Sequence, residues 1–141
     1  MKYYHVAPEK ELSTIFSKGI QANSKGEIVI IFLKDEFVMK KFVFDVYAHE
    51  ELQMDTYCAF EISEVGIEGP LFDSGINSIF SDSFRVSKQP KIESKYLKLF
   101  KSGENYEGMG LIDGVFPVEH KDKFTDIYKR KVLYYLKQVV S

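Results

Sequence analysis

One continuous apolar run, IVIIF at residues 28–32, constrains the fold of this 141-residue chain more than any other stretch. A half-buried strand alternates apolar and polar residues, whereas a short unbroken run of Ile, Val and Phe is typical of a fully buried strand. We therefore expect a buried strand here. The chain is long enough to enclose such a strand in a core without disulfides, and we expect residues 1–141 to form a single domain.

The other segments mix extended and helical patterns in an irregular order. Strands are expected at residues 2–6, within DTYCAFEISEVGI and at 84–88, and helices at 8–18, in the run after Asp35 and at 121–140. In the first helix, Pro8 suits the first helical position and Gly19 the end. The segment KIESKYLKLFK has helical spacing, although a strand followed by a turn is also open. This order predicts an α+β domain rather than a doubly wound sheet.

Charge and cysteine content narrow the function classes. The formal net charge is −2 with both signs spread along the chain, so no basic stripe indicates strong nucleic-acid binding. Cys58 is the single cysteine, which excludes an intramolecular disulfide and favours a reducing, cytoplasmic setting. No apolar run reaches the ~18 residues of a membrane span, so we expect no membrane partner.

Familiar catalytic motifs are missing from the sequence. It has no phosphate-binding loop, no Gly-x-Gly-x-x-Gly after a strand and no His-Glu-x-x-His helix, and the Cys/His cluster of a zinc site is absent, so no metal site is predicted. The feature that stands out is His5, which follows the strand-prone residues 2–4 and precedes a helix. The end of a strand is a common place for chemistry, and equally for an ordinary surface histidine.

The order of several short motifs resembles the ADP-ribosyltransferase fold. YYHVAPEKELSTIFSKGI resembles the family's first strand, which ends in a histidine and leads into a helix closing at Gly-hydrophobic. IVIIFLKDEFVM is similar to the next strand and acid-capped helix, TYCAFEISEVGI to the following strand, and DSFRVSKQPKI to a later strand and turn. The family includes RNA 2′-phosphotransferase-like, toxin-like and phage anti-CRISPR branches. The resemblance covers roughly residues 2–92 and implies small mixed or antiparallel sheets in a split core with flanking helices.

The resemblance implies NAD as the cofactor and assigns residues to it. His5 matches the position that holds the ribose hydroxyls, and Phe32 and Phe37 are the aromatic faces that would pack nicotinamide. Arg85 would neutralise the pyrophosphate, although a salt bridge beside a strand is the structural alternative. The family's reaction builds an oxocarbenium-like centre, as in glycoside hydrolysis, so a carboxylate is needed beside the developing charge.

The catalytic set implied by the resemblance is His5 with one acid, Asp82 or Glu119, and Glu119 is favoured because a Gly-Val-aromatic run that leads into an acid resembles the end of the phage anti-CRISPR branch. In SDSFRV the expected position falls closest to Ser83, with Asp82 one residue away, whereas IDGVFPVEH would make Glu119 the acid. A slip of one residue turns a strand side chain to the opposite face, so the two alternatives differ in geometry. The sequence also departs from the family, because Ala7 stands where a hydroxyl residue is usual and Phe32 where Tyr is usual.

Three functions follow from these observations. The first is an NAD-dependent mono-ADP-ribosyltransferase that modifies a protein or nucleic-acid target, as in phage or mobile-element counter-defence. The second is a catalytically degenerate member of the same fold that binds a nucleotide or a protein; the missing hydroxyls at Ala7 and Phe32 favour it. The third is an unrelated α+β protein whose aromatic residues fill a core.

Overall fold

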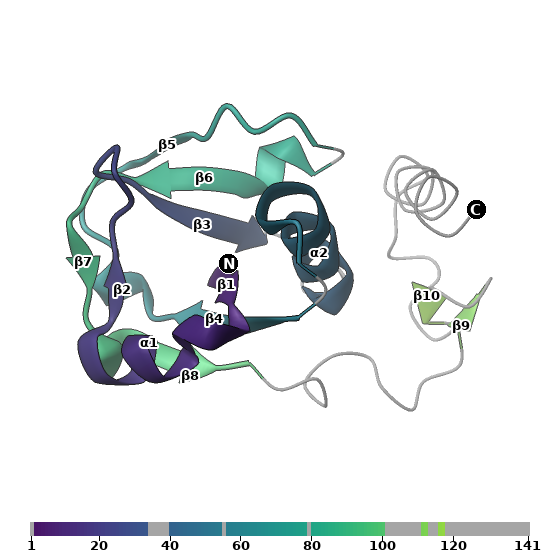
Figure 1. Cartoon of the computed structure of the whole chain (residues 1–141). Helices are drawn as coiled ribbons and strands as arrows, with labels where there is room; N and C mark the ends of the chain where they lie inside the picture. The colour runs from purple at the N-terminus through teal and green to yellow at the C-terminus, as the bar shows by residue number, and fades with distance from the viewer. Residues whose placement is uncertain are drawn as a thin grey trace.

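The computed structural model describes residues 2–33, 40–54, 56–78 and 80–100, together with the short strands at 111–112 and 116–117. Within these residues, six antiparallel strands form one sheet in the order β5-β6-β3-β1-β4-β8 (Figure 1). Their bounds are β1 Lys2–Pro8, β3 Ile28–Leu33, β4 Tyr57–Ile62, β5 Leu71–Asp73, β6 Phe84–Ser87 and β8 Leu97–Leu99.

The remaining elements are short. Two further strand pairs are β2 (Ile20–Gln21) with β7 (Lys91–Ile92), and β9 (Leu111–Ile112) with β10 (Phe116–Pro117). The helices are α1 (Leu12–Lys18) and α2 (Lys40–Tyr47), the latter continued by a π-helical turn, Ala48–Leu52. Single 3₁₀ turns lie at Glu9–Glu11, Glu64–Gly66, Ser81–Ser83 and Ser94–Tyr96. The predicted α+β class is therefore confirmed.

Strand β3 is buried on both faces, as its apolar run predicts. Ile30 packs with Phe60 in the core layer that α1 covers, and Ile31 packs with Phe44 in the layer that α2 covers. Figure 1 shows the two helices on different sides of the sheet. Both isoleucines are fully buried, and each contributes about 1.5–3 kcal/mol from removal of its side chain from water. The sheet interior is thus sealed by two apolar layers.

The first helix begins later than its sequence pattern predicts. Pro8 is the last residue of β1, paired with Tyr57, and α1 begins at Leu12 after a 3₁₀ turn. Proline has no backbone N–H, but at the end of a strand this removes no hydrogen bond that the sheet needs. The fixed φ of Pro8 therefore fits the extended end of β1, and the helix begins later. The predicted end is confirmed: Gly19 has φ +78°, and a Cβ there would lie 2.2 Å from the Ile92 carbonyl oxygen.

Of the two alternatives left open for KIESKYLKLFK, the helix is wrong over the described residues 91–100, and the strand followed by a turn is confirmed. The described residues form β7, a 3₁₀ turn and β8 instead. Leu97 and Leu99 alternate along β8 opposite Ile62 and Phe60, and the Ser63 N–H donates to the Tyr96 carbonyl at 2.8 Å. Pairing with β4 satisfies the backbone of β8 on that side and half-buries the two leucines, which an isolated helical turn could not do.

The connection between β4 and β5 determines where a pocket can form. Strand β4 lies on one side of β1 and β5 lies beyond β6, so residues 63–70 must pass β1, β3 and β6. Strand β1 also separates from β3: the two pair only at Lys2–Tyr4, whereas β1 pairs with β4 from Tyr3 to Pro8. The connection formed by residues 63–70, hereafter the 63–70 loop, therefore crosses the sheet. In this sheet, the two central strands β1 and β3 separate beyond Tyr4.

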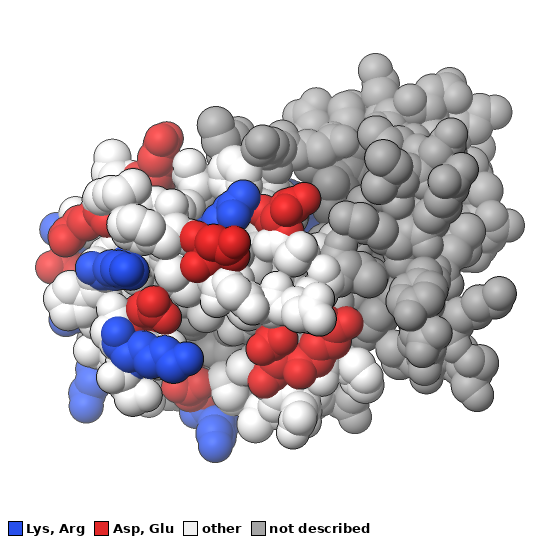
Figure 2. Space-filling view, turned by 90° about the horizontal axis from the view of Figure 1, so that it is seen from above, with Lys and Arg blue, Asp and Glu red and all other residues white. Residues whose placement is uncertain are grey.

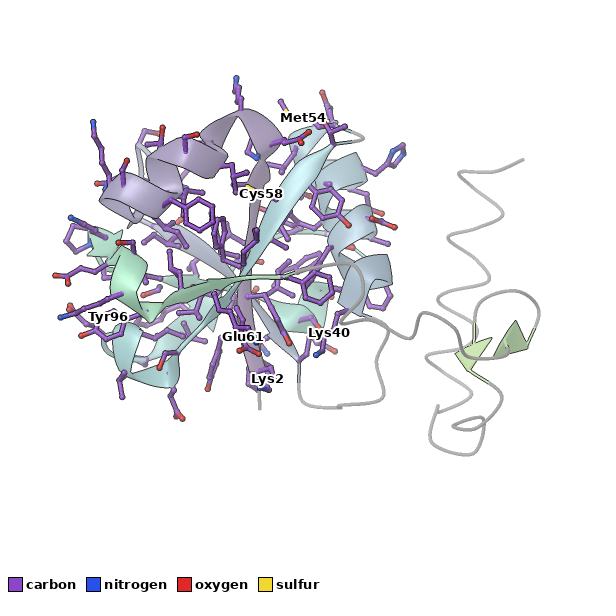
Figure 3. All side chains as sticks on the ribbon, turned by 90° about the horizontal axis from the view of Figure 1, so that it is seen from below. Lys2, Lys40, Met54, Cys58, Glu61 and Tyr96 are labelled. Atoms are coloured by element: carbon purple, nitrogen blue, oxygen red, sulfur yellow. The ribbon has the colours of Figure 1, made fainter. Side chains whose placement is uncertain are left out.

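The described surface carries both signs of charge. Figure 2 shows lysine and arginine side chains interspersed with aspartate and glutamate on the face seen from above. On another side, Figure 3 shows Lys2 and Glu61 close together on adjacent strands, and their Nζ and Oε1 atoms are 3.0 Å apart. None of the helices described is both long and apolar enough to cross a membrane.

Candidate functional site

A pocket of about 400 Å³ lies between the sheet and the 63–70 loop. The described residues that line it are Tyr3, Phe32, Glu64, Ile67, Gly69, Pro70, Leu71 and Arg85. Strand register explains the first wall. Tyr3 of β1 is opposite Phe32 of β3. Arg85 of β6 is opposite Ile30, which is two residues before Phe32 and therefore on the same face. Leu71 of β5 is opposite Ser87, two residues after Arg85, so the four lining side chains share one face of the sheet. The loop supplies the facing wall.

Two aromatic rings form the floor at one end. The centroids of Tyr3 and Phe32 are 5.6 Å apart, with the ring planes tilted by 39°. Both side chains are half-buried, so part of each ring contacts the pocket while the rest packs against the sheet. Tilted rings at this distance attract each other, and their faces offer a surface for a flat ligand.

Arg85 places a cation on the same wall. Its side chain is half-buried, and no salt bridge to it forms within the described part of the chain. Asp73 lies opposite Arg85 in the β5–β6 register, but the Asp73 Oδ1 atom accepts the Gly75 N–H at 2.9 Å. The salt-bridge alternative for Arg85 is therefore not what the described residues show. A half-buried guanidinium that faces a pocket is suited to bind an anion.

The 63–70 loop is held in place by one buried amide, that of Gln89. Its Oε1 accepts the Glu68 N–H at 2.8 Å and the Ser87 hydroxyl at 2.6 Å, and its Nε2 donates to the carbonyls of Gly66 and Lys91 at 3.1 and 2.9 Å. The side chain is only 3% exposed. Every polar atom of this amide is used, so the loop wall is fixed before any ligand arrives.

Close packing fixes the same loop from its other side. Gly66 lies directly against Tyr96, labelled in Figure 3, and a Cβ at residue 66 would be 2.7 Å from the Tyr96 Cβ. Glu64, two residues earlier, is exposed and contributes a carboxylate to the pocket. Among the described lining residues, Arg85 and Glu64 thus provide one positive and one negative charge.

His5 lies on the same face of the sheet, two residues after Tyr3, but it is not among the described residues that line the pocket. Its ring Nδ1 is 2.8 Å from the Val29 carbonyl oxygen. A carbonyl only accepts, so Nδ1 carries the proton and Nε2 keeps its lone pair in the neutral ring. Burial lowers the pKa of His5, and the hydrogen bond to Val29 opposes that shift.

This hydrogen bond has a structural role in the opened sheet. If the β1–β3 register continued beyond Tyr4, Val6 would face Val29, but the ladder between the two strands stops at Tyr4. The His5 side chain supplies a donor to the carbonyl where the strands separate. The ribose-binding role of His5 stays a prediction.

Of the remaining predicted site residues, the structure describes Asp82 alone. Asp82 is exposed in the 3₁₀ turn before β6 and does not line the pocket. Phe37 and Glu119 lie outside the described residues, as does the expected helix at 121–140. The choice between Asp82 and Glu119 is untested.

Of the eight described lining residues, Phe32 and Arg85 were predicted, and the six others, Tyr3 and Glu64 among them, were not. Tyr3 could have been found, because strand periodicity places residues i and i+2 on one face and His5 was already a candidate. Glu64 gives no such signal, since it becomes a lining residue only through the path of the 63–70 loop. Cys58, labelled in Figure 3, is buried in β4, and no cluster of three potential metal-ligating side chains occurs among the described residues.

Comparisons of the chain with protein-family models, with curated proteins and with solved structures find no match.

Proposed function

We propose that the pocket between the sheet and the 63–70 loop binds NAD or a related nucleotide, and that the protein is an ADP-ribosyltransferase-like enzyme. The main supporting observation is that Tyr3, Phe32 and Arg85, from three different strands, meet on one face at one pocket. Phe32 and Arg85 are two of the residues that the sequence resemblance assigns to NAD.

The chemistry of the pocket suits a nucleotide. Nucleotides combine a flat ring with phosphate, and the pocket combines a tilted aromatic pair with a guanidinium free of ion pairs within the described chain. Arginine binds phosphate oxygens through paired N–H donors, and aromatic faces bind planar rings. The volume of about 400 Å³ falls in the range of small-molecule sites, about 300–1,000 Å³.

Each residue has a defined task in the proposed activity. NAD, when bound, supplies an ADP-ribosyl group through cleavage of its ribose–nicotinamide bond, and the bond's electron pair leaves with nicotinamide. Tyr3 and Phe32 would hold the flat ring, and Arg85 would orient the phosphates. A carboxylate near the reacting carbon would favour the developing positive charge. Glu64 is the described carboxylate on the pocket wall. The acceptor would be a nucleophile on a protein target.

A second candidate function is nucleotide binding without turnover. The observation that favours it is the position of Asp82, which is exposed on a turn and does not line the pocket. Ala7 adds to this, because it is 3% exposed within the core layer under α1, where it offers no hydroxyl to a ligand. The two functions share one binding site and differ only in whether nicotinamide is released.

Calorimetry with NAD and ADP-ribose tests the binding site. Arg85→Met keeps the aliphatic stem and removes the charge, so it should weaken binding of both ligands about ten-fold or more, the usual size for a charged hydrogen bond. Lys88→Met is the matched control: Lys88 is exposed near the end of β6, with its Nζ 4.6 Å from the Phe72 ring centroid, and does not line the pocket. It should bind like the wild type.

Nicotinamide release then separates the two candidates. Release that depends on Arg85 and on a target protein supports the enzyme, whereas binding without release supports the binding module. Absence of heat with both NAD and ADP-ribose would contradict the proposed function in either form.

A further inference from the structure

We infer that Glu64 makes this pocket selective for phosphates that carry one negative charge at each phosphorus, as in the internal pyrophosphate of a dinucleotide, and against terminal phosphate monoesters, which carry close to two charges on one phosphorus. The inference rests on the proposed nucleotide site and names a residue that sets its specificity. It concerns the charge of the ligand, and it is independent of whether nicotinamide is released.

The fold sets the position of the Glu64 backbone. Glu64 opens the 3₁₀ turn that follows β4, and this turn is closed by the Gly66 N–H to Ser63 and the Ile67 N–H to Glu64, at 2.9 and 3.0 Å. Gln89 and Tyr96 hold the next residues of the loop from two sides. The backbone that carries the carboxylate is therefore braced against the sheet.

The two charges act on the same ligand. Glu64 and Arg85 line one pocket of about 400 Å³, whose dimensions are comparable with the Debye length of about 8 Å at physiological ionic strength. Salt in solution therefore screens neither charge fully from a bound phosphate. The carboxylate reduces the positive potential that Arg85 produces within the pocket.

The reduced potential matters more for a doubly charged phosphate. The attraction of a phosphate to the pocket grows in proportion to its charge, whereas the cost of taking it out of water grows with the square of the charge. One guanidinium offset by one carboxylate compensates the dehydration of a monoanion better than that of a dianion. Internal phosphodiesters and pyrophosphate links are monoanionic at each phosphorus, and terminal monoesters approach two charges at neutral pH.

Mononucleotides and their methyl esters test this inference. AMP and nicotinamide mononucleotide each differ from their phosphate O-methyl ester by one methyl group and one charge, and all four can be measured by displacement of NAD at pH 8. The wild type should bind each ester more tightly than its parent. Glu64→Gln should shift this preference toward the parent by about five-fold, the order of the effect of one charge within the same pocket in a medium between water and a protein surface.

Glu68→Gln is the matched control, because Glu68 is an exposed glutamate of the same loop that does not line the pocket. It should leave the preference unchanged. An equal preference in the wild type and Glu64→Gln, with NAD still bound, would overturn this inference and leave the proposed function intact. If neither NAD nor any of the four probes binds the wild type, both are overturned.

Discussion

His5 shows how a polar side chain can complete a sheet at the residue scale. Its Nδ1–H donates to the Val29 carbonyl where β1 and β3 cease to pair. An unpaired buried carbonyl costs about 1–3 kcal/mol, so the ring contributes to stability irrespective of any ligand. The donor is present in both protonation states, but burial of the ring disfavours the charged one.

The lowered pKa of His5 predicts a dependence of stability on pH. The unfolded chain binds a proton near pH 6.5 and the folded chain only at lower pH, so the unfolded state binds more protons in that window. The contribution of His5 is therefore complete above pH 6.5 and is lost as the pH falls toward its folded pKa. Urea unfolding between pH 8 and 5 should show this loss, and His5→Gln should remove it.

His49→Gln is the control for this experiment, since it removes an exposed imidazole and should retain the loss of stability that His5 causes. If the free energy of unfolding of His5→Gln depended on pH as in the wild type, the fold would not favour the neutral form of His5.

Residue patterns predicted the sheet wall of the pocket better than its loop wall. Phe32 and Arg85 were assigned from short strand motifs, and strand alternation alone brings them to one face. Glu64 could not be found in this way, because a turn residue has no periodicity and its neighbours depend on strands far away in the sequence. Asp82 was chosen by its distance from a strand motif, and a turn residue so placed lies at the exposed end of that strand.

At the scale of elements, tertiary pairing decided what local spacing could not. Residues 91–99 have apolar positions compatible with a helix, yet they form β7, a 3₁₀ turn and β8, because β2 and β4 offer unpaired edges to them. The run after Asp35 posed the same ambiguity, and the helix prediction is confirmed for Lys40–Tyr47, where Val43 and Phe44 bury one face of α2 against the sheet. The two segments have similar local patterns but different partners: residues 91–99 meet the unpaired edges of β2 and β4, whereas Lys40–Tyr47 packs on the face of the sheet.

The hydrogen bonds that the Gln89 side chain makes to the 63–70 loop give a direct test of what holds this loop. Gln89→Ala would leave the Gly66 and Lys91 carbonyls and the Glu68 N–H without their partner. We expect a loss of about 2–4 kcal/mol in the free energy of unfolding, because one buried and two part-buried groups lose their partner at about 1–3 kcal/mol each and less than additively. Nucleotide binding should weaken as well, because the loop forms one wall of the pocket. Chemical denaturation and calorimetry measure the two effects.

Gln21→Ala is the matched control for the loop prediction. Gln21 is exposed, and its Nε2 donates only to the nearby Lys18 carbonyl among the bonds described, so its loss should cost less than about 1 kcal/mol. Equal effects of the two substitutions would show that Gln89 does not brace the loop.

For the whole molecule, the described fold is one sheet with an apolar layer on each face. The layer under α2 contains Tyr4, Ile31 and Phe84, and the layer under α1 contains Ile30 and Phe60. The sheet joins both layers, because alternate residues of β1, β3 and β4 point into each. We therefore expect the two layers to unfold together in one cooperative transition.

Cys58 provides a probe of that cooperativity, since it is the single cysteine and lies 6% exposed in the layer under α1. Burial and the nearby carboxylates of Glu11 and Glu9 raise the pKa of its thiol to about 11, so both access and thiolate formation are suppressed in the folded chain. Labelling with a thiol reagent at pH 8 should be slow in water. The labelling rate should rise with urea in parallel with the loss of secondary structure, as expected when modification requires global opening.

Ser17→Cys in a Cys58→Ala background is the control, because it places the thiol on the exposed face of α1, where it should react at once. Labelling of Cys58 at the pace of that control, before secondary structure is lost, would show that α1 opens separately from the sheet and that the two layers do not unfold as one.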